Sequence, residues 1–464
     1  MNSIFTKIYE QNPWFMDFRN IHEDVHLARL NRYRYIWREK SFLEYHFEDG
    51  IYFLYGPRQI GKSTLLKMFI QDHITSENST AFFYFNCDFL DSKKEIVELV
   101  EVYLSKIPKL NQRIYILLDE ITSIHDGILG VKFLVDSGKS KNITYILSGS
   151  SSVNIKKTGE YLPGRRAKGI DFVLIPLSFS DFLNLQYTWI PSFIENINDQ
   201  NREKKYYELT SEINLPDLFD DYLMCGGIPR VINEFYKNQE IDYEIQEIYK
   251  NWISSEVAKH NKKEYLIKII LNRISLSLGS TVSYNSFLQD AGIGSHNTVH
   301  DYLDFLENAY IINQLYHFDF HQQKVQYRKN KKIYFIDSYI GHMIDWWVNS
   351  RVKLNSDFIK NNLLASRIVE NVVFNNLKRI HGEDLYFYRN NFEIDFVSKN
   401  NWMIEVKYQN KIIKEDYSHL TKLNKKFKII VVSKNDLFYD HPIDIIPVAF
   451  FLLIQKRLLN HYHT

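Results

Sequence analysis

The chain has 464 residues, 45% of them hydrophobic, which is enough to bury two to four cores of domain size. Its formal net charge of +1 excludes attraction of the whole molecule to nucleic acid, so such a partner would have to be bound by local basic patches. Two cysteines exclude a disulfide framework or a cysteine zinc site, and no signal sequence or apolar run of roughly 20 residues is found, so we expect a soluble cytoplasmic protein without membrane contact.

Residues 1–45 are expected to form a helical segment in which basic and aromatic residues alternate. They are Arg29, Arg32, Tyr33, Arg34, Tyr35, Trp37 and Arg38. Such a pattern can bind nucleic acid through phosphate contacts and base stacking. Most such segments, however, are helices that pack their rings on the core and leave their arginines in water. Both interpretations stay open.

A phosphate-binding loop follows an apolar strand-like run at residues 51–55 and precedes a helical pattern. The loop reads Gly56, Pro57, Arg58, Gln59, Ile60, Gly61, Lys62, Ser63 and Thr64. The two glycines allow backbone N–H groups to point at phosphates, and Lys62 brings a positive charge to the outer phosphates. Ser63 is the expected Mg²⁺ ligand. The segment therefore predicts nucleotide binding, with ATP and Mg²⁺ as the cofactors.

Two carboxylates come directly after a second apolar run at residues 114–118. The carboxyl ends of strands are where ligands of open α/β sheets bind. Asp119 is the expected second ligand of Mg²⁺, and Glu120 is the expected general base that activates water. The pair predicts that the bound nucleotide is hydrolysed.

Three further strands, at residues 80–88, 143–147 and 171–175, complete the predicted sheet. Strands that alternate with helices predict an α/β fold with a parallel sheet. Ser148 follows one of these strands, where its hydroxyl can sense the terminal phosphate. Alternatively, Ser148 and the serines after it cap the next helix.

The sequence resembles the archaeal and bacterial AAA+-type ATPases of the AAA_14 kind. The resemblance rests on the phosphate loop, Leu117-Leu118-Asp119-Glu120, Leu147-Ser148-Gly149-Ser150-Ser151, Leu162-Pro163-Gly164-Arg165, Pro176-Leu177-Ser178-Phe179, Gly226-Gly227-Ile228-Pro229 and Glu405-Val406-Lys407. It implies an ATPase core at residues 46–190, a helical lid at 191–258 and assembly into a homo-oligomer.

The same resemblance implies roles for three residues. Arg165, with Arg166 as its alternative, lies where relatives place an arginine finger that reaches a neighbouring subunit's nucleotide. Gly227 and Pro229 resemble the turn by which a helical lid touches the nucleotide. A simple helix stop explains this Gly and Pro equally well.

Residues 259–325 resemble a winged helix. The expected recognition helix, from residue 295 to 306, contains no Lys or Arg and two Asp, which argues against direct base readout. The basic stretch that follows is the better candidate for phosphate contact. It contains Lys324, Arg328, Lys329, Lys331 and Lys332. DNA is therefore the expected partner, although a purely structural winged helix fits as well.

Residues 326–464 contain two expected strands of a hairpin, at 393–397 and 403–407. Glu405 and Lys407 are two positions apart and project from one face of a strand, with Asp395 across the hairpin. Glu370, on an expected helix, can add a further carboxylate. This arrangement resembles the restriction-nuclease-like PD-(D/E)xK fold, which implies Mg²⁺ ligands at Asp395, Glu405 and Glu370 and a catalytic role for Lys407.

Two functions fit these motifs. In the first, the chain is a Mg²⁺-dependent ATPase that binds and remodels DNA, with branched DNA as one substrate class, and carries a nuclease-like domain. In the second, it is a nucleotide-controlled regulatory or defence switch whose carboxyl-terminal domains only bind DNA or protein. Whether the nuclease-like domain cleaves DNA is left open.

Overall fold

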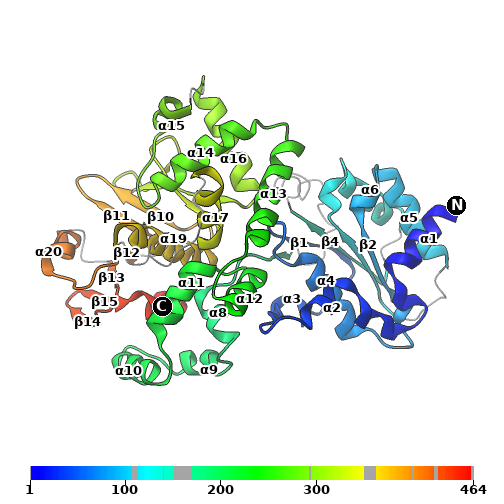
Figure 1. Ribbon diagram of the computed structural model, residues 1–464, viewed down its shortest axis with the longest axis horizontal. Coiled ribbons are helices and arrows are strands. Elements are labelled where there is room, and N and C mark those ends of the chain that lie inside the picture. The colour runs from blue at the N-terminus through cyan, green and yellow to red at the C-terminus, as the bar shows by residue number, and fades with distance from the viewer. Residues whose placement is uncertain are drawn as a thin grey trace. The chain divides into compact units, whose positions relative to one another are not determined.

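The computed structural model describes residues 2–106, 112–138, 141–150, 170–291, 294–349, 362–399, 402–422 and 427–460. The chain forms two compact units, which are described separately (Figure 1). Unit 1 contains residues 1–175 and 308–310, and unit 2 contains residues 176–307 and 311–464. The unit boundary lies earlier than the predicted end of the ATPase core at residue 190, because the segment from Pro176 packs with unit 2.

Unit 1 is built on a five-stranded sheet in the order β2-β3-β4-β1-β5. Every pairing in it is parallel. The strands are β1 Gly50–Tyr55, β2 Phe82–Asn86, β3 Ile114–Asp119, β4 Ile143–Gly149 and β5 Asp171–Val173. They match the five strands predicted from the apolar runs. The prediction of an α/β core with a parallel sheet is confirmed.

Helices cover both faces of this sheet (Figure 1). They are α1 Asn2–Gln11, α2 Val25–Leu30, α3 Lys40–Leu43, α4 Lys62–His73, α5 Lys93–Lys106 and α6 Gly127–Asp136. On one face, α1, α5 and α6 bury an apolar cluster with Phe53, Phe83 and Leu118. On the other, Phe42 of α3 and Phe69 of α4 pack ring to ring. Both faces of the sheet are therefore shielded from solvent, as is typical of parallel sheets.

The amino-terminal segment is part of unit 1 and covers its edge strand β2. The Asn12 side chain accepts a hydrogen bond from Tyr84 N–H at 2.7 Å and donates one to the Tyr84 carbonyl at 2.8 Å. Trp14 Nε1 donates to the Phe82 carbonyl at 2.8 Å. These side chains replace a neighbouring strand and so protect an otherwise open edge. Tyr35 is buried while Arg29 and Arg32 are exposed, which favours the packing interpretation of this segment.

Unit 2 contains a mixed eight-stranded sheet in the order β14-β15-β13-β12-β11-β10-β7-β8. The strands are β7 His317–Asp319, β8 Lys324–Gln326, β10 Tyr386–Arg389, β11 Glu393–Val397, β12 Trp402–Lys407, β13 Lys428–Ser433, β14 Phe438–Asp440 and β15 Ile443–Pro447. The antiparallel pair β11–β12 is the predicted hairpin. The pair β7–β8 belongs to the same sheet, since β7 lies next to β10. The predicted domain boundary at residue 325 therefore falls inside a strand of this sheet.

A two-stranded antiparallel sheet, β6 Ile312–Leu315 with β9 Lys332–Phe335, accompanies it. The helices of unit 2 are α8 Phe179–Asn184, α9 Ile190–Glu195, α10 Arg202–Glu212, α11 Leu215–Cys225, α12 Pro229–Asn238, α13 Tyr243–Lys259, α14 Glu264–Leu276, α15 Tyr284–Ala291, α16 His296–Asn308, α17 Ser338–Asn349, α19 Asn362–His381, α20 Lys414–Tyr417 and α21 Val448–Asn460. The long α19 and α21 pack on the central strands of the large sheet.

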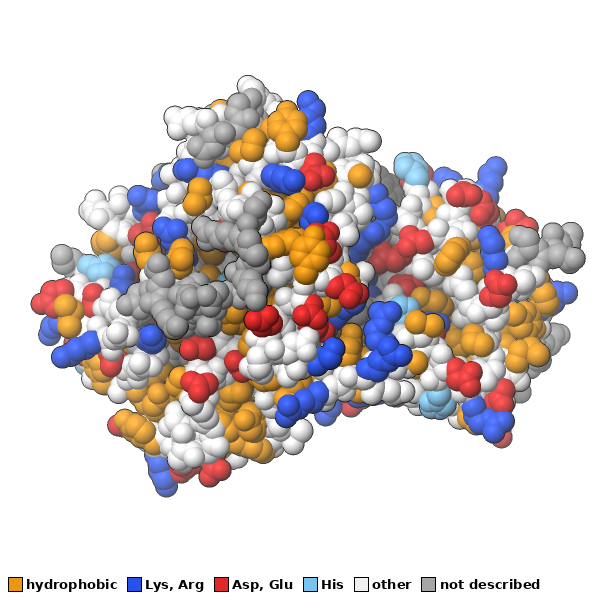
Figure 2. Space-filling model, viewed as in Figure 1, with side chains coloured by type: hydrophobic (Ala, Val, Ile, Leu, Met, Phe, Trp, Pro, Cys, Tyr) orange, Lys and Arg blue, Asp and Glu red, His pale blue; other side chains and the backbone are white. Residues whose placement is uncertain are grey.

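The surface drawn in Figure 2 carries interspersed basic and acidic side chains, as the near-zero net charge requires. Across the described ranges, none of the helices combines the length and apolar character needed to span a bilayer.

Candidate functional site

The phosphate loop of unit 1 joins β1 to α4. Gly56 has φ of 150°, and a Cβ there would lie 2.0 Å from the Leu174 carbonyl oxygen, so only glycine fits. Gly61 has φ of 110°, in the region that favours glycine, and no atom lies within 4 Å of where its Cβ would be. The loop therefore leaves open space directly at the amino end of α4, which is where a phosphate binds in such folds.

Lys62 is the first residue of α4, and its ammonium lies inside the loop. Its Nζ donates to the carbonyls of Gly56 and Pro57, both at 3.0 Å. It also lies 3.5 Å from Glu120 Oε1. Lys62 is only 4% exposed, so its charge acts in a poorly solvated environment. The lysine of the loop and the predicted general base are thus neighbours.

Asp119 and Glu120 stand at the carboxyl end of β3, as predicted. Asp119 is 1% exposed, accepts a 2.8 Å hydrogen bond from the Tyr84 hydroxyl, and accepts another from the Ser148 hydroxyl. The Ser148 hydroxyl also accepts from the Glu120 backbone N–H at 3.1 Å. Ser148 therefore links both carboxylate residues. The segment that Ser148 and the following serines were expected to cap lies outside the described residues, so helix capping stays an alternative.

Tyr84 is a site residue that sequence reasoning missed. Burial and the Asp119 charge raise the pKa of its hydroxyl, so it remains a hydrogen-bond donor. Glu120 has φ of 52° and ψ of 40°, a left-handed conformation that is costly for this residue type. Its Oε2 is buried without a hydrogen-bond partner among the described residues. A glutamate with a strained backbone and a buried side-chain oxygen that lacks a hydrogen-bond partner fits a catalytic role.

These residues fit ATP with Mg²⁺. The open loop suits the phosphates, Lys62 supplies the countercharge, and the Ser63 hydroxyl with the Asp119 carboxylate would hold the ion. When bound, Mg²⁺ would neutralise charge on the phosphates. For the remaining loop positions, Arg58 to Ile60 and Thr64, nucleotide contact stays a prediction.

The other predicted nucleotide contacts are those of Arg165 or Arg166 and of the turn at Gly227 and Pro229. Arg165 and Arg166 lie outside the described residues. Gly227 sits between α11 and α12, where its N–H donates to Asp337 Oδ2 and its carbonyl accepts from Leu177 N–H, both at 2.7 Å. Pro229 is the first residue of α12. A packing role thus accounts for this turn, and its contact with nucleotide stays a prediction.

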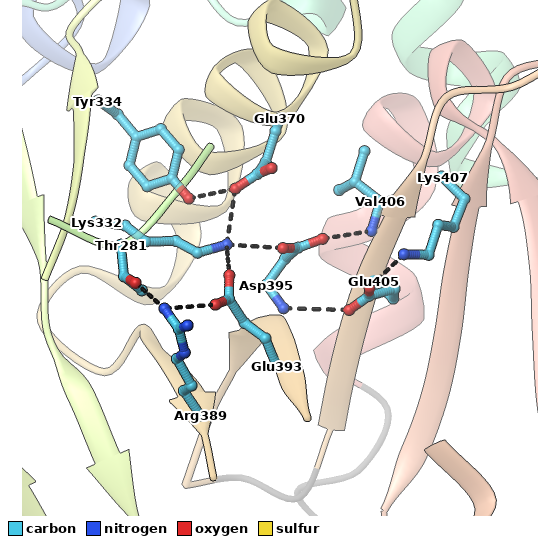
Figure 3. Close-up of polar contacts among 10 residues, drawn as sticks. All are labelled: Thr281, Lys332, Tyr334, Glu370, Arg389, Glu393, Asp395, Glu405, Val406 and Lys407. Atoms are coloured by element: carbon cyan, nitrogen blue, oxygen red, sulfur yellow. Dashed lines mark hydrogen bonds and ion pairs between the residues drawn. The ribbon is translucent and has the colours of Figure 1, made fainter. Parts of the chain in front are cut away.

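Unit 2 brings together the predicted metal ligands around a lysine (Figure 3). Lys332 of β9 has a side chain that is 0% exposed. Its Nζ lies 2.7 Å from Asp395 Oδ1, 2.9 Å from Glu393 Oε1 and 3.0 Å from Glu370 Oε1. The Tyr334 hydroxyl donates to the same Glu370 oxygen at 2.7 Å. Burial opposes the charge of Lys332, but these carboxylates raise its pKa well above the usual value.

Glu405 and Lys407 pair on β12, as their spacing predicted. Lys407 Nζ lies 2.8 Å from Glu405 Oε1, and Asp395 Oδ2 accepts a 2.9 Å hydrogen bond from Val406 N–H. Burial and the Asp395 charge raise the pKa of Glu405 to about 8 and that of Glu370 to about 7.

The cluster in this form does not fit Mg²⁺. With the Lys332 ammonium in place, no group of three His, Cys, Asp or Glu residues among the described residues could hold a metal ion. Glu370 and Asp395 converge on Lys332 Nζ, while Glu405 converges on Lys407. The assignment of these carboxylates as metal ligands, and of Lys407 as catalytic, stays a prediction that the observed contacts oppose.

The basic stretch predicted to contact DNA divides into two groups. Lys324, Arg328 and Lys329 are exposed. The prediction is wrong for Lys331 and Lys332, which are buried. Lys332 is the first residue of β9, and Lys331 forms an isolated bridge with Val282 directly before it.

The expected recognition helix is α16. Asp301 on this helix pairs with Lys262, and Asp304 lies 2.8 Å from His300 Nδ1. Lys262 therefore compensates the charge of Asp301, and α16 contains no Lys or Arg that could contact phosphate. The order of helices and of the β6–β9 pair agrees with a winged helix, which stays a prediction.

Comparison with known families assigns the first unit. Residues 48–183 match the family model of an AAA domain. This part of the chain is therefore similar to AAA domains. Residues 216–348 and 365–451 match two domains of unknown function, DUF8612 and DUF4143.

Two curated relatives cover most of the chain and are themselves uncharacterised. The protein MJ1544 of Methanocaldococcus jannaschii is 26% identical over 379 residues, which is 77% of this chain and 74% of that one. A Haemophilus influenzae protein is 23% identical over 323 residues, or 67% and 72% of the two chains. The shared length shows that both units of this chain recur together.

Similar solved structures include the Aeropyrum pernix Orc1 protein in complex with DNA, with 11% identity, 70% of this chain and 92% of that chain covered, and a TM-score of 0.29. Cdc6p of Pyrobaculum aerophilum shows 12% identity, coverage of 80% and 99%, and a TM-score of 0.23. TM-scores this low carry no inference about function.

Proposed function

We propose that the protein is a Mg²⁺-dependent ATPase that binds and remodels DNA. The observation that carries the ATPase part is the meeting of Lys62, Asp119 and Glu120 at the end of β3, beside a glycine-rich loop. The match of residues 48–183 to an AAA domain supports it. The DNA part rests on the exposed basic stretch of unit 2 and on the resemblance noted in the sequence.

Each residue of the ATPase site has a role in this proposal. Glu120 accepts a proton from the attacking water, because its unsatisfied Oε2 is free to bind that water. Lys62 exchanges its carbonyl contacts for phosphate oxygens. Ser148 and Tyr84 fix the carboxylate of Asp119, so that the loss of either reduces turnover through misplacement.

We further propose that the protein acts as a homo-oligomer in which Arg165 completes the neighbouring subunit's site. Arg165→Ala is expected to lower ATP turnover and spare ATP binding, because a guanidinium stabilises charge only in the transition state. A mixture of Arg165→Ala with the hydrolysis-deficient Glu120→Gln protein should regain part of the activity. ATPase rates of mixtures over a range of ratios measure this. If the mixtures show only the sum of the separate rates, the finger does not act between subunits.

DNA contact through Lys324, Arg328 and Lys329 predicts a salt-dependent effect. Changing all three to Gln should weaken binding to every DNA sequence. It should also reduce the magnitude of the slope of log K against log salt concentration by roughly 3, because each phosphate contact releases counterions when it forms. It should also remove the stimulation of the ATPase by DNA. Fluorescence anisotropy and ATPase assays with single-stranded, duplex, forked and four-way DNA measure both.

The matched control is the triple change of Lys237, Lys259 and Lys263, exposed lysines of unit 2, to Gln. It removes the same charge elsewhere and should leave the slope unchanged. Equal losses in both triple variants would contradict a specific DNA surface. An ATPase that no DNA form stimulates would contradict DNA remodelling.

A second function, the nucleotide-controlled switch, is favoured by one observation. The carboxylates of the nuclease-like region are neutralised by lysines of the chain itself. Under this proposal, the carboxyl-terminal unit binds DNA or a protein and does not cut. If a divalent cation permits nicking of any DNA form and Asp395→Ala abolishes it, unit 2 cleaves DNA and the switch proposal is wrong.

A further inference from the structure

The carboxylate cluster of unit 2 already contains a cation. Glu370 comes from α19, Glu393 and Asp395 from β11, and the three converge within 3.0 Å of one ammonium, that of Lys332 (Figure 3). This is the arrangement in which carboxylates from separate elements gather around an ion, with the ion replaced by the end of a side chain. The cluster therefore has a resident charge that is covalently attached.

We infer that the Lys332 ammonium takes the place of a divalent cation in this cluster, so that unit 2 in this form is closed to Mg²⁺. Three features support this. The Lys332 side chain is completely buried, its three carboxylate contacts come from two elements, α19 and β11, and the Tyr334 hydroxyl occupies a further lone pair of Glu370. Little acceptor capacity remains for a metal ion, which needs several oxygen ligands at once.

The contacts also explain why Lys332 holds its position. Lys332 belongs to the two-stranded sheet, whereas Asp395 belongs to the eight-stranded sheet. Glu370 and Asp395 are buried, so removing the ammonium would leave the charge of these two carboxylates without its buried countercharge. The lysine thus fastens the two sheets together and neutralises the cluster at the same time.

Replacement of the lysine tests the inference. Lys332→Met keeps much of the side-chain volume and removes the charge, so the freed carboxylates should bind one Mn²⁺ ion. The double variant Lys332→Met with Asp395→Asn should lack this Mn²⁺ site. Mn²⁺ binding is measured by electron paramagnetic resonance without nucleotide, which separates it from any outcome for the ATPase or for DNA. Mn²⁺ should also raise the melting temperature of Lys332→Met by roughly 2 to 4 °C, through ligand linkage.

The matched control is Lys331→Met. Lys331 is a buried lysine at the adjacent position of the chain, but its Nζ lies over the Tyr284 ring and donates to the Tyr284 hydroxyl at 2.7 Å. This variant should bind Mn²⁺ like the wild type.

Two results would overturn the inference. One is a Mn²⁺ site in the wild-type protein that Asp395→Asn removes. This result contradicts the inference even if Lys332→Met fails to fold. The other is a folded Lys332→Met protein, with a wild-type circular dichroism spectrum, that gains no Mn²⁺ site. Absence of a wild-type site at Asp395 supports the inference.

Discussion

Lys62→Ala is expected to abolish ATP binding, whereas Glu120→Gln should retain ATP and lower its hydrolysis by about 100-fold or more. The lysine provides the buried countercharge for the phosphates, so binding cannot survive its loss. The glutamate provides the base, and an amide of the same shape leaves the ground state intact while removing the proton acceptor. Equilibrium binding of a fluorescent ATP analogue and a coupled ATPase assay measure the two effects.

Exposed residues of unit 1 serve as controls for these variants. Lys94→Ala and Glu77→Gln remove charges from its surface and should leave binding and turnover near wild type. If Glu120→Gln hydrolyses ATP at the wild-type rate, the base assignment is wrong. If Lys62→Ala binds ATP with unchanged affinity, the loop does not bind the phosphates as proposed.

The ATPase core could be predicted from the sequence because its signals are local. A glycine-rich loop between an apolar strand and a helix, and two carboxylates after another strand, are each read within about ten residues. The parallel sheet then forces the strand ends to one edge, which brings Asp119 and Ser148 together. Sequence reasoning needed only the strand pattern to place them.

The contacts of Asn12, Tyr84 and Lys332 could not be predicted in this way. Asn12 reaches Tyr84 across 72 positions, and Lys332 reaches Asp395 across 63. A lysine next to a turn is usually solvated. The continuous apolar run Ile333-Tyr334-Phe335 after Lys332 was the available sign that this strand is buried on both faces, as all three residues are.

The turn at Gly227 should be intolerant of any side chain. A Cβ at this position would lie 2.1 Å from the Leu177 carbonyl oxygen and 2.6 Å from its nitrogen, which are backbone atoms that cannot move aside singly. Gly227→Ala must therefore separate the turn from Leu177 and weaken its hydrogen bond to Asp337. We expect unit 2 to lose about 3 kcal/mol of its free energy of unfolding.

Urea denaturation followed by tryptophan fluorescence measures this loss, because five of the seven tryptophans belong to unit 2. Gly294→Ala is the matched control, since no atom lies within 4 Å of its Cβ position and the substitution should cost little. A stable Gly227→Ala protein with weakened ATP binding would instead assign this turn to the nucleotide. Destabilisation with ATP binding retained by the folded protein identifies it as a packing element, because its polar groups are already used by Asp337 and Leu177.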